Sequence, residues 1–314
     1  MYAIEALSLA KSYGKGEAVS DVSLKVGKGA VFGFLGPNGA GKTTTIRMLT
    51  TLIQPSRGDA RVLGFDLRSH GPEIRPHIGV VLQGESYEYS KSVEQALDLY
   101  GMLWDIPRRT REERAETLLD EFGLEEHRKK LVQHLSLGLR RRLQVAREFI
   151  HDAELLFLDE PTVGLDPIAR KGTMKMIREK VSRGLTVFLT TQLLDEAETL
   201  CDRVAVIFGG KIISEGTPRE LKDTYGGVRL VEVLVGSGDP GLLASRMLGT
   251  RSVSGAVTDP DGRVRVWTSD PSGTFSAILG AGEDLGLELG SVTVREPNLE
   301  QAFINLIQKQ GGTD

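Results

Sequence analysis

The sequence contains little cysteine and no long apolar segment, and each absence excludes a class of protein. Cys201 is the only cysteine among 314 residues, so no intrachain disulfide and no thiolate metal site of the usual kind can form, which fits a reducing, cytoplasmic setting. No segment approaches the roughly 18 apolar residues of a transmembrane helix. The first residues also lack the apolar region of a signal peptide. If the protein acts at a membrane, we expect a partner to hold it there.

The sequence also lacks a net positive charge. The formal net charge is -4, whereas binding along a nucleic acid requires a positive face, so we expect no direct contact with nucleic acid. Arg140, Arg141 and Arg142 form a basic cluster, but three consecutive residues fan around a helix. We therefore interpret them as a solvated face with local salt bridges. The five histidines have no metal-ligand spacing and are interpreted as structural or surface residues.

The remaining composition indicates two globular domains. The apolar fraction of 40% and the charged fraction of 26% are ordinary values, and 314 residues leave room for about two cores. Over residues 1–225, short apolar segments alternate with helical periodicity, which predicts an α/β domain with a mostly parallel sheet covered on both faces. Within it, residues 84–150 are predicted to form an inserted helical subdomain. Gly226-Gly227 is the predicted linker to the next domain.

Residues 228–314 have a different order of elements. The predicted strands and helices follow one another as β-α-β-β-α-β, which is the order of a ferredoxin-like α+β domain. The two middle strands flank a turn at Asp259-Pro260-Asp261-Gly262, and an amphipathic helix from Leu299 to Ile307 closes the chain. We expect a small accessory domain here.

A phosphate-binding loop is predicted between the apolar strand Ala30–Leu35 and a helix over Gly41–Leu52, because residues 36–43 fit the pattern G-x-x-x-x-G-K-[ST]. Its glycines let backbone N–H groups surround phosphates, and the helix N-terminus favours anions. Lys42 would reach the β- and γ-phosphates of ATP, and Thr43 would supply a hydroxyl to Mg²⁺. The predicted ATP-binding residues of this loop are Gly36, Pro37, Asn38, Gly39, Ala40, Gly41, Lys42, Thr43 and Thr44.

Two adjacent carboxylates end the apolar strand Leu155–Leu158. Asp159 is suited to hold Mg²⁺ and Glu160 to polarise the attacking water, because the two roles need acids that point to different sides of one site. The alternative is a simple strand-ending Asp-Glu pair before Pro161. The phosphate-binding loop upstream favours the catalytic interpretation, in which Lys42 and Glu160 are catalytic and Thr43 and Asp159 are metal ligands.

With these motifs in this order, the sequence resembles the nucleotide-binding subunits of ABC transporters over residues 1–222. The resemblance implies a P-loop NTPase core, a Tyr13 ring stacked on adenine, and a Gln83 that contacts ATP and Mg²⁺. It also implies a head-to-tail homodimer in which Ser136 and Gly138 of the signature motif and Asp166 of the D-loop border the ATP at the interface. The alternatives are a packed surface aromatic for Tyr13, an ordinary loop residue for Gln83 and a helix N-cap for Asp166.

The sequence departs from the family pattern at two places. Leu137 and Leu139 stand in the signature where glycine and a polar residue are usual, which puts the closure of the dimer in doubt. Gln192 stands where most members have the switch histidine; its amide can donate a hydrogen bond to the γ-phosphate but cannot relay a proton near neutral pH. Glutamine here resembles the daunorubicin/doxorubicin-resistance type of ABC ATPase and makes Gln192 a catalytic candidate. The alternative is a drifted, weakly active site.

The resemblance implies an ABC exporter whose ATPase works through separate membrane permease subunits, held at the cytoplasmic face of the membrane. We expect the segment Gly84–Tyr100, with its tyrosines and charges, to be the docking surface. A soluble ABC ATPase acting in DNA repair or translation is the main alternative, although the chain lacks a heptad insertion. The transported substrate is not encoded here. The C-terminal domain is either regulatory, dimer-supporting or a stabilising appendage.

Overall fold

The protein, described here from a computed structural model, consists of two compact units, Met1–Pro218 and Arg219–Asp314. The structure describes residues 1–14, 16–84 and 86–311. The division falls directly after the first residue of helix α8 (Pro218–Tyr225), whereas the predicted linker, Gly226-Gly227, follows that helix. The Asn305 side chain of the last helix donates a hydrogen bond to the Tyr225 carbonyl, which ties α8 to the second unit.

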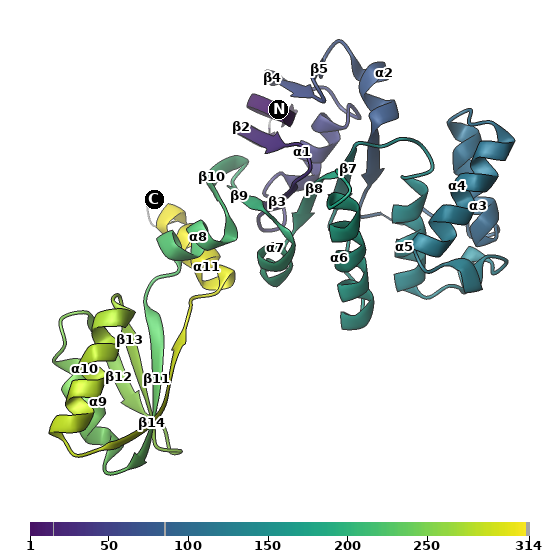
Figure 1. Cartoon of the computed structure of the whole chain (residues 1–314). Coiled ribbons are helices and arrows are strands. Elements are labelled where there is room, and N and C mark those ends of the chain that lie inside the picture. Colours follow the sequence, from purple (N-terminus) through teal and green to yellow (C-terminus); the bar gives the residue numbers. More distant parts are fainter. Residues whose placement is uncertain (15, 85, 312–314) are drawn as a thin grey trace. The chain divides into compact units, whose positions relative to one another are not determined.

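The strands of the first unit form a ten-stranded sheet in the order β5-β4-β1-β2-β10-β9-β3-β8-β7-β6 (Figure 1). Strands β9, β3, β8, β7 and β6 are parallel neighbours, as predicted. The bounds are β1 (Tyr2–Tyr13), β2 (Gly16–Gly27), β3 (Val31–Leu35), β4 (Arg57–Val62), β5 (Phe65–Asp66), β6 (Ile78–Val81), β7 (Leu155–Asp159), β8 (Thr186–Thr191), β9 (Arg203–Phe208) and β10 (Lys211–Gly216).

The remaining neighbour pairs are mixed: β2 pairs parallel with β10, whereas β10 pairs antiparallel with β9, so the predicted mostly parallel sheet also has an antiparallel part. β1 pairs antiparallel with both β2 and β4, and β4 pairs antiparallel with β5. For β1 and β2 the reason is the short connection between them, because parallel neighbours need a crossover of a dozen or more residues.

Helices flank the parallel strands and form the inserted subdomain. α1 follows β3, and α6 and α7 lie on either side of β8 in the chain, whereas α3, α4 and α5 form the helical subdomain predicted over residues 84–150 (Figure 1). Ser92 caps α3 with a reciprocal bond to Gln95, which fixes where this helix starts. The bounds are α1 (Lys42–Leu49), α2 (Gly71–Ile74), α3 (Val93–Leu103), α4 (Arg108–Glu121), α5 (Leu137–Arg147), α6 (Pro167–Val181) and α7 (Leu194–Leu200).

The core of the first unit joins the central strands to the neighbouring strands and to α1. The ring of Phe188 on β8 packs against Phe32 and Phe157 of the neighbouring strands, with ring centroids 5.6 and 5.7 Å apart. Cys201 is 5% exposed and its Sγ lies against Gly33 of β3, so closely that a Cβ at Gly33 would meet it at 2.7 Å. Burial raises the pKa of the Cys201 thiol far above its usual value. These contacts hold the central strands rigidly, and the candidate site is built at their carboxyl ends.

The second unit has the topology predicted from its element order. Its sheet has the order β12-β13-β11-β14 with antiparallel neighbours throughout, as in a ferredoxin-like fold (Figure 1). Buried residues of β11 and β13, such as Val231 and Val266, pack with α9 and α10 in a separate core. The bounds are β11 (Arg229–Ser237), α9 (Pro240–Leu248), β12 (Val253–Thr258), β13 (Arg263–Thr268), α10 (Pro271–Asp284), β14 (Glu288–Arg295) and α11 (Leu299–Gly311).

Within the described residues of both units, no helix has both the length and the apolar character required to cross a membrane.

Candidate active site

The loop between β3 and α1 is shaped by three glycines. Gly39 and Gly41 have φ angles of 80° and 108°, a backbone region that glycine enters without a steric cost, and Gly41 forms the N-cap of α1. A Cβ at Gly36 would lie 2.4 Å from the Ile207 carbonyl oxygen of β9. The predicted loop residues Gly36–Thr43 therefore wrap tightly over the sheet edge, and bulkier residues at these glycines would deform the loop. Pro37, Asn38, Ala40 and Thr44 lie in the same turn and first helical residues.

Lys42 is the buried cation of this loop. Its side chain is the first of α1 and only 6% of the residue is exposed. The Nζ donates hydrogen bonds to the carbonyl oxygens of Gly36 (2.8 Å) and Pro37 (3.3 Å), and it lies 3.3 Å from Glu160 Oε1. The loop thus surrounds the amine, and the positive charge of Lys42 lies where it could bind phosphate oxygens.

Asp159 and Thr43 face each other across the loop. Thr43 Oγ1 donates a hydrogen bond to Asp159 Oδ2 at 2.8 Å, and Thr190 Oγ1 of β8 donates to the other oxygen, Oδ1, at 2.5 Å. Asp159 is 1% exposed. Because both carboxylate oxygens are held by hydroxyl groups from two different elements, the side chain has a single orientation, with one oxygen directed at the Thr43 hydroxyl.

Glu160 follows Asp159 in a strained backbone conformation. Its φ is 49°, in the left-handed region, which costs about 1–2 kcal/mol for a residue with a Cβ. The conformation turns the side chain toward Lys42, while Gln83 Nε2 donates a hydrogen bond to Glu160 Oε2 at 2.9 Å. The Glu160 N–H is held by the carbonyl and hydroxyl oxygens of Thr190, each at 3.1 Å. Strain of this kind is often found at functional sites, where the surrounding structure over-determines the conformation.

The structure therefore brings five predicted residues into one constellation and leaves others on separate elements. Lys42, Thr43, Gln83, Asp159 and Glu160 are joined by the contacts above. Gln192 directly follows β8, whose Thr191 pairs with Leu35 before the loop, and its side chain is exposed. Tyr13 lies at the end of β1 with its ring half exposed, 5.5 Å from the Lys11 amine.

The signature residues lie at the start of α5. Ser136 is the exposed N-cap, and its hydroxyl accepts a hydrogen bond from the Leu139 N–H at 3.3 Å. A Cβ at Gly138 would meet the Ala169 side chain of α6 at 2.8 Å, so the glycine permits close packing of the two helices. Asp166 caps α6 with bonds from the Ile168 and Ala169 N–H groups, which confirms the predicted N-cap.

The donor set is consistent with a hydrated Mg²⁺ shared with phosphates. A hydroxyl (Thr43), a carboxylate (Asp159) and an amide (Gln83) are hard oxygen donors, which Mg²⁺ prefers, and Mg²⁺ is usually held by one or two carboxylates plus substrate phosphates. In the part of the chain that the structure describes, no group of three or more His, Cys, Asp or Glu side chains could hold a metal by itself. A cation here would therefore need phosphate oxygens and water to complete its shell.

Comparison with known proteins decides the family. The sequence profile of the ABC transporter family matches residues 19–163. The daunorubicin resistance ATP-binding protein DrrA3 of Streptomyces coeruleorubidus is 38% identical over 297 residues, which cover 94% of this chain and 93% of that protein. The chain belongs to the ABC transporter family. It is an ATP-binding protein and an ATPase.

Other relatives of this ABC ATPase agree. The Nod factor export ATP-binding protein I of Rhizobium etli is 36% identical over 319 residues, which cover 99% of this chain and 95% of that protein. Among solved structures, cbiO1 of Clostridium perfringens, described as part of the ABC transporter complex cbiONQ, has a TM-score of 0.66, 28% identity, and covers 70% of this chain and 90% of its own. The predicted fold class of the ABC ATPase is thus confirmed.

Sequence reasoning missed Arg141, and the structure corrects the interpretation of its cluster as a solvated face. Arg141 is 7% exposed and points from α5 into the ABC ATPase core. Its guanidinium donates a hydrogen bond to Gln144 Oε1 and to four backbone carbonyls, and burial lowers the pKa of this group below its usual value. The carbonyls are those of Leu82 (3.3 Å), Asp159 (3.3 Å), Glu160 (3.2 Å) and Pro161 (2.8 Å).

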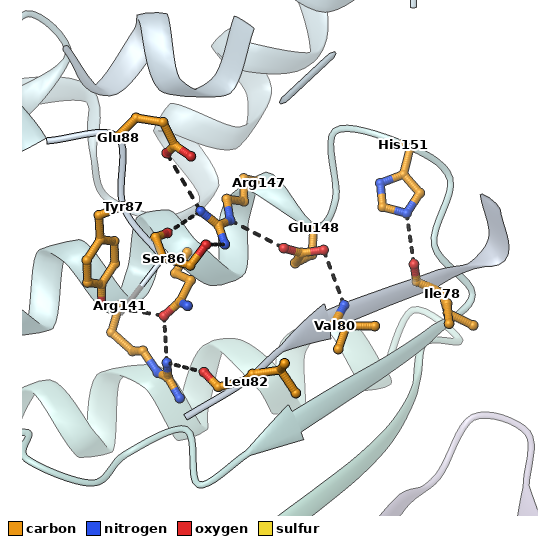
Figure 2. A network of polar contacts seen from close by, with 11 residues as sticks. Ile78, Val80, Leu82, Ser86, Tyr87, Glu88, Arg141, Arg147, Glu148 and His151 are labelled. Carbon is orange, nitrogen blue, oxygen red and sulfur yellow. Dashed lines mark hydrogen bonds and ion pairs between the residues drawn. The ribbon is translucent and has the colours of Figure 1, made fainter. Parts of the chain in front are cut away.

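Arg147, at the other end of α5, was also missed. It donates hydrogen bonds to the Ser86 backbone and hydroxyl oxygens, and it pairs with Glu88 and Glu148 (Figure 2). Glu148 also accepts a hydrogen bond from the Val80 N–H of β6 at 3.2 Å, and burial raises the pKa of its carboxyl. A single buried arginine outside the motifs leaves no periodic signal. Only the fold therefore reveals that α5 contacts the segment after Gln83 through Arg147 and the end of the carboxylate strand through Arg141.

Proposed function

We propose that the chain is the ATP-hydrolysing subunit of an ABC exporter and that it drives transport through separate membrane permease subunits. The observation that supports this most directly is the contact between Glu160 and both Lys42 and Gln83, beside an Asp159 bonded to Thr43. These residues match the parts needed for phosphoryl transfer to water. Relatives that are described as acting in daunorubicin resistance and Nod factor export support the direction of transport.

In this proposal the loop binds and orients the triphosphate. The backbone N–H groups of residues 36–44 and the Lys42 amine receive the phosphate oxygens, while the Tyr13 ring stacks on adenine. Thr43, Asp159 and Gln83 hold Mg²⁺, which when bound neutralises charge on the phosphates. The two hydroxyl bonds to Asp159 fix that carboxylate before any ligand arrives, so little reorganisation is required on binding.

Glu160 would accept a proton from the attacking water. Glu160 Oε2 accepts a hydrogen bond from the Gln83 amide, and Glu160 Oε1 lies 3.3 Å from the Lys42 amine, so both carboxylate oxygens are held in the site before hydrolysis. When Lys42 turns to phosphate oxygens, Glu160 Oε1 is released to act as general base. Gln192 would donate a hydrogen bond to the γ-phosphate from the end of β8.

A second copy of the chain would complete the site. Ser136 and Gly138 at the start of α5, together with Asp166 before α6, would face the ATP of the opposite subunit in a head-to-tail homodimer. Ser136 and Asp166 are exposed, as such a role requires. Leu137 is 37% exposed beside Gly164, so it would occupy the dimer interface where the usual signature has glycine. We infer a weakened closure of the dimer.

The permease would dock on the segment after Gln83, at the inner face of the membrane. Of the predicted docking segment Gly84–Tyr100, Glu85 lies outside the described residues. The described part presents Tyr87 and Tyr89, whose rings lie 5.7 and 5.8 Å from the Arg140 guanidinium of α5. Movement of this segment would pass to α5 through Arg140 and the Ser86 contacts of Arg147, and from α5 to the carboxylate strand through Arg141.

The test is the Mg-ATPase rate of the purified full-length protein beside Glu160→Gln, with size-exclusion chromatography in ATP. Loss of a general base lowers the rate by about 10²–10⁴-fold, and we expect the variant to accumulate as an ATP-bound dimer. Glu113→Gln, the same change on the exposed face of α4, is the control and should leave the rate unaltered. A Glu160→Gln protein that hydrolyses ATP at the wild-type rate would refute the assignment of the base, and retention in the soluble fraction of cells that contain the permease would favour the non-transport alternative.

A further inference from the structure

A buried carboxylate outside the nucleotide-binding constellation connects two of its loops. Glu196, on α7, is 3% exposed. Its Oε1 accepts a hydrogen bond from the Thr162 hydroxyl, and its Oε2 accepts one from the Thr191 hydroxyl at 3.2 Å. Arg170 Nε of α6 lies 3.4 Å from Oε1 and supplies the opposite charge. Both threonines are 1% exposed, so the bridge is enclosed by protein.

The two threonines are placed next to the two residues proposed to act on the water and the γ-phosphate. Thr162 comes two residues after Glu160, and Thr191 directly precedes Gln192. Thr191 Oγ1 also accepts a hydrogen bond from the Leu193 N–H at 2.9 Å. The hydroxyl therefore links the two residues that flank Gln192. Gln192 itself is exposed. Its position therefore depends on how the backbone around Thr191 is held.

A carboxylate is suited to this connection for a chemical reason. It offers two acceptor oxygens to two hydroxyl donors, so each threonine donates to it and both loops are fixed relative to one side chain. Burial of an unpaired carboxylate would be costly, and the Arg170 contact and two hydroxyl bonds offset that cost. Burial also raises the pKa of the Glu196 carboxyl.

We propose that Glu196 is a positioning residue for ATP hydrolysis, which holds the loop after β8 against the loop after β7 and thereby sets the place of the Gln192 amide relative to Glu160. This inference rests on the proposed function of the site. Glu196 bonds to Thr162 and Thr191, so in this proposal it acts through the backbone next to Glu160 and Gln192. A displacement of about 1 Å at a reacting group is sufficient to change a rate by up to about 10²-fold.

The experiment is a double-mutant cycle on kcat in the full-length protein, with Glu196→Ala and Gln192→Ala made singly and together. We expect Glu196→Ala to lower kcat about tenfold and to change KM for Mg-ATP less than about twofold, because the phosphate-binding loop is untouched. In the Gln192→Ala background, removal of Glu196 should lower kcat less than about twofold, because the residue through which it acts is already gone. A purely structural role would give the same loss in both backgrounds.

Thr162→Val provides a second route if Glu196→Ala folds poorly. It removes one hydroxyl donor without changing volume, and it should slow hydrolysis only when Gln192 is present. Thr199→Val, an isosteric change on the exposed side of the same helix, is the matched control and should have no effect. Equal losses in both backgrounds, or a Gln192→Ala variant with unchanged kcat, would overturn the positioning role. A wild-type protein without Mg-ATPase activity would overturn the proposed function as well, so the two failures are distinguishable.

Discussion

Replacement of Arg141 by methionine is expected to destabilise the first unit strongly, because the buried guanidinium donates to five acceptors. Five hydrogen bonds would be lost, four of them to backbone carbonyls. The Glu160 carbonyl also accepts a bond from the Val163 N–H at 3.4 Å, so about three carbonyls would lose a close donor. At about 1 kcal/mol or more for each unsatisfied buried group, the expected loss is about 3 kcal/mol. Removal of the guanidinium also removes the desolvation cost of its charge, which keeps the expected loss of stability near the low end of its range.

The assay is thermal unfolding followed by fluorescence. Trp104 lies in the first unit and Trp267 in the second, so a Trp267→Phe background makes emission report the first unit alone. For a unit of this size, about 3 kcal/mol corresponds to a fall of about 6–12 °C in midpoint. Arg140→Met is the matched control: its guanidinium lies over tyrosine rings at 5.7 and 5.8 Å, contacts worth about 1 kcal/mol. Equal shifts for the two variants would refute the argument.

The remaining predictions concern pH and docking. Burial lowers the pKa of His151 below the ordinary value of 6.5, so the unfolded chain binds the proton at a higher pH than the folded chain. The contribution of His151 to stability is therefore complete above about pH 6.5 and is lost as the pH falls below it. The unfolding midpoint of the wild type should drop more between pH 7.5 and 5.5 than that of His151→Phe. Tyr87→Ala removes a tyrosine ring from the proposed docking segment and should abolish transport by the complex with permease subunits while basal hydrolysis persists. A variant that keeps both activities would exclude Tyr87 from docking.

Much of the fold was predictable because the parallel strands are continuous apolar runs. Leu155–Leu158 and Val204–Ile207 are buried on both faces, and such short apolar runs separated by helices are typical of a parallel sheet. β4 was missed for the opposite reason. Its sequence, Arg57-Gly58-Asp59-Ala60-Arg61-Val62, lies at the outer part of the sheet and buries only Ala60 and Val62, so charge obscures the alternation. α8 was missed because it is a short polar helix with a single buried apolar residue, Leu221.

The site was predictable to the extent that its chemistry lies in short segments. The phosphate-binding loop and the Asp159-Glu160 pair each depend on residues adjacent in sequence, so a motif is sufficient to find them. The residues that orient them come from distant elements: Thr190 lies on the next strand, and Arg141 on a helix whose basic triplet looked solvent-exposed. Burial and hydrogen-bond partners of a single arginine are properties of the fold, and no spacing rule distinguishes it from its neighbours Arg140 and Arg142.

The setting of Cys201 makes this protein convenient for labelling. The one thiol is packed against Gly33 inside the sheet, and its raised pKa leaves almost no thiolate, the form that reacts with maleimides. The wild-type chain therefore provides an unreactive background into which single new cysteines can be introduced on exposed faces of α4 and α6. Dyes or spin labels attached there would report the separation of the helical subdomain from the strands during the ATPase cycle, without removal of any native residue.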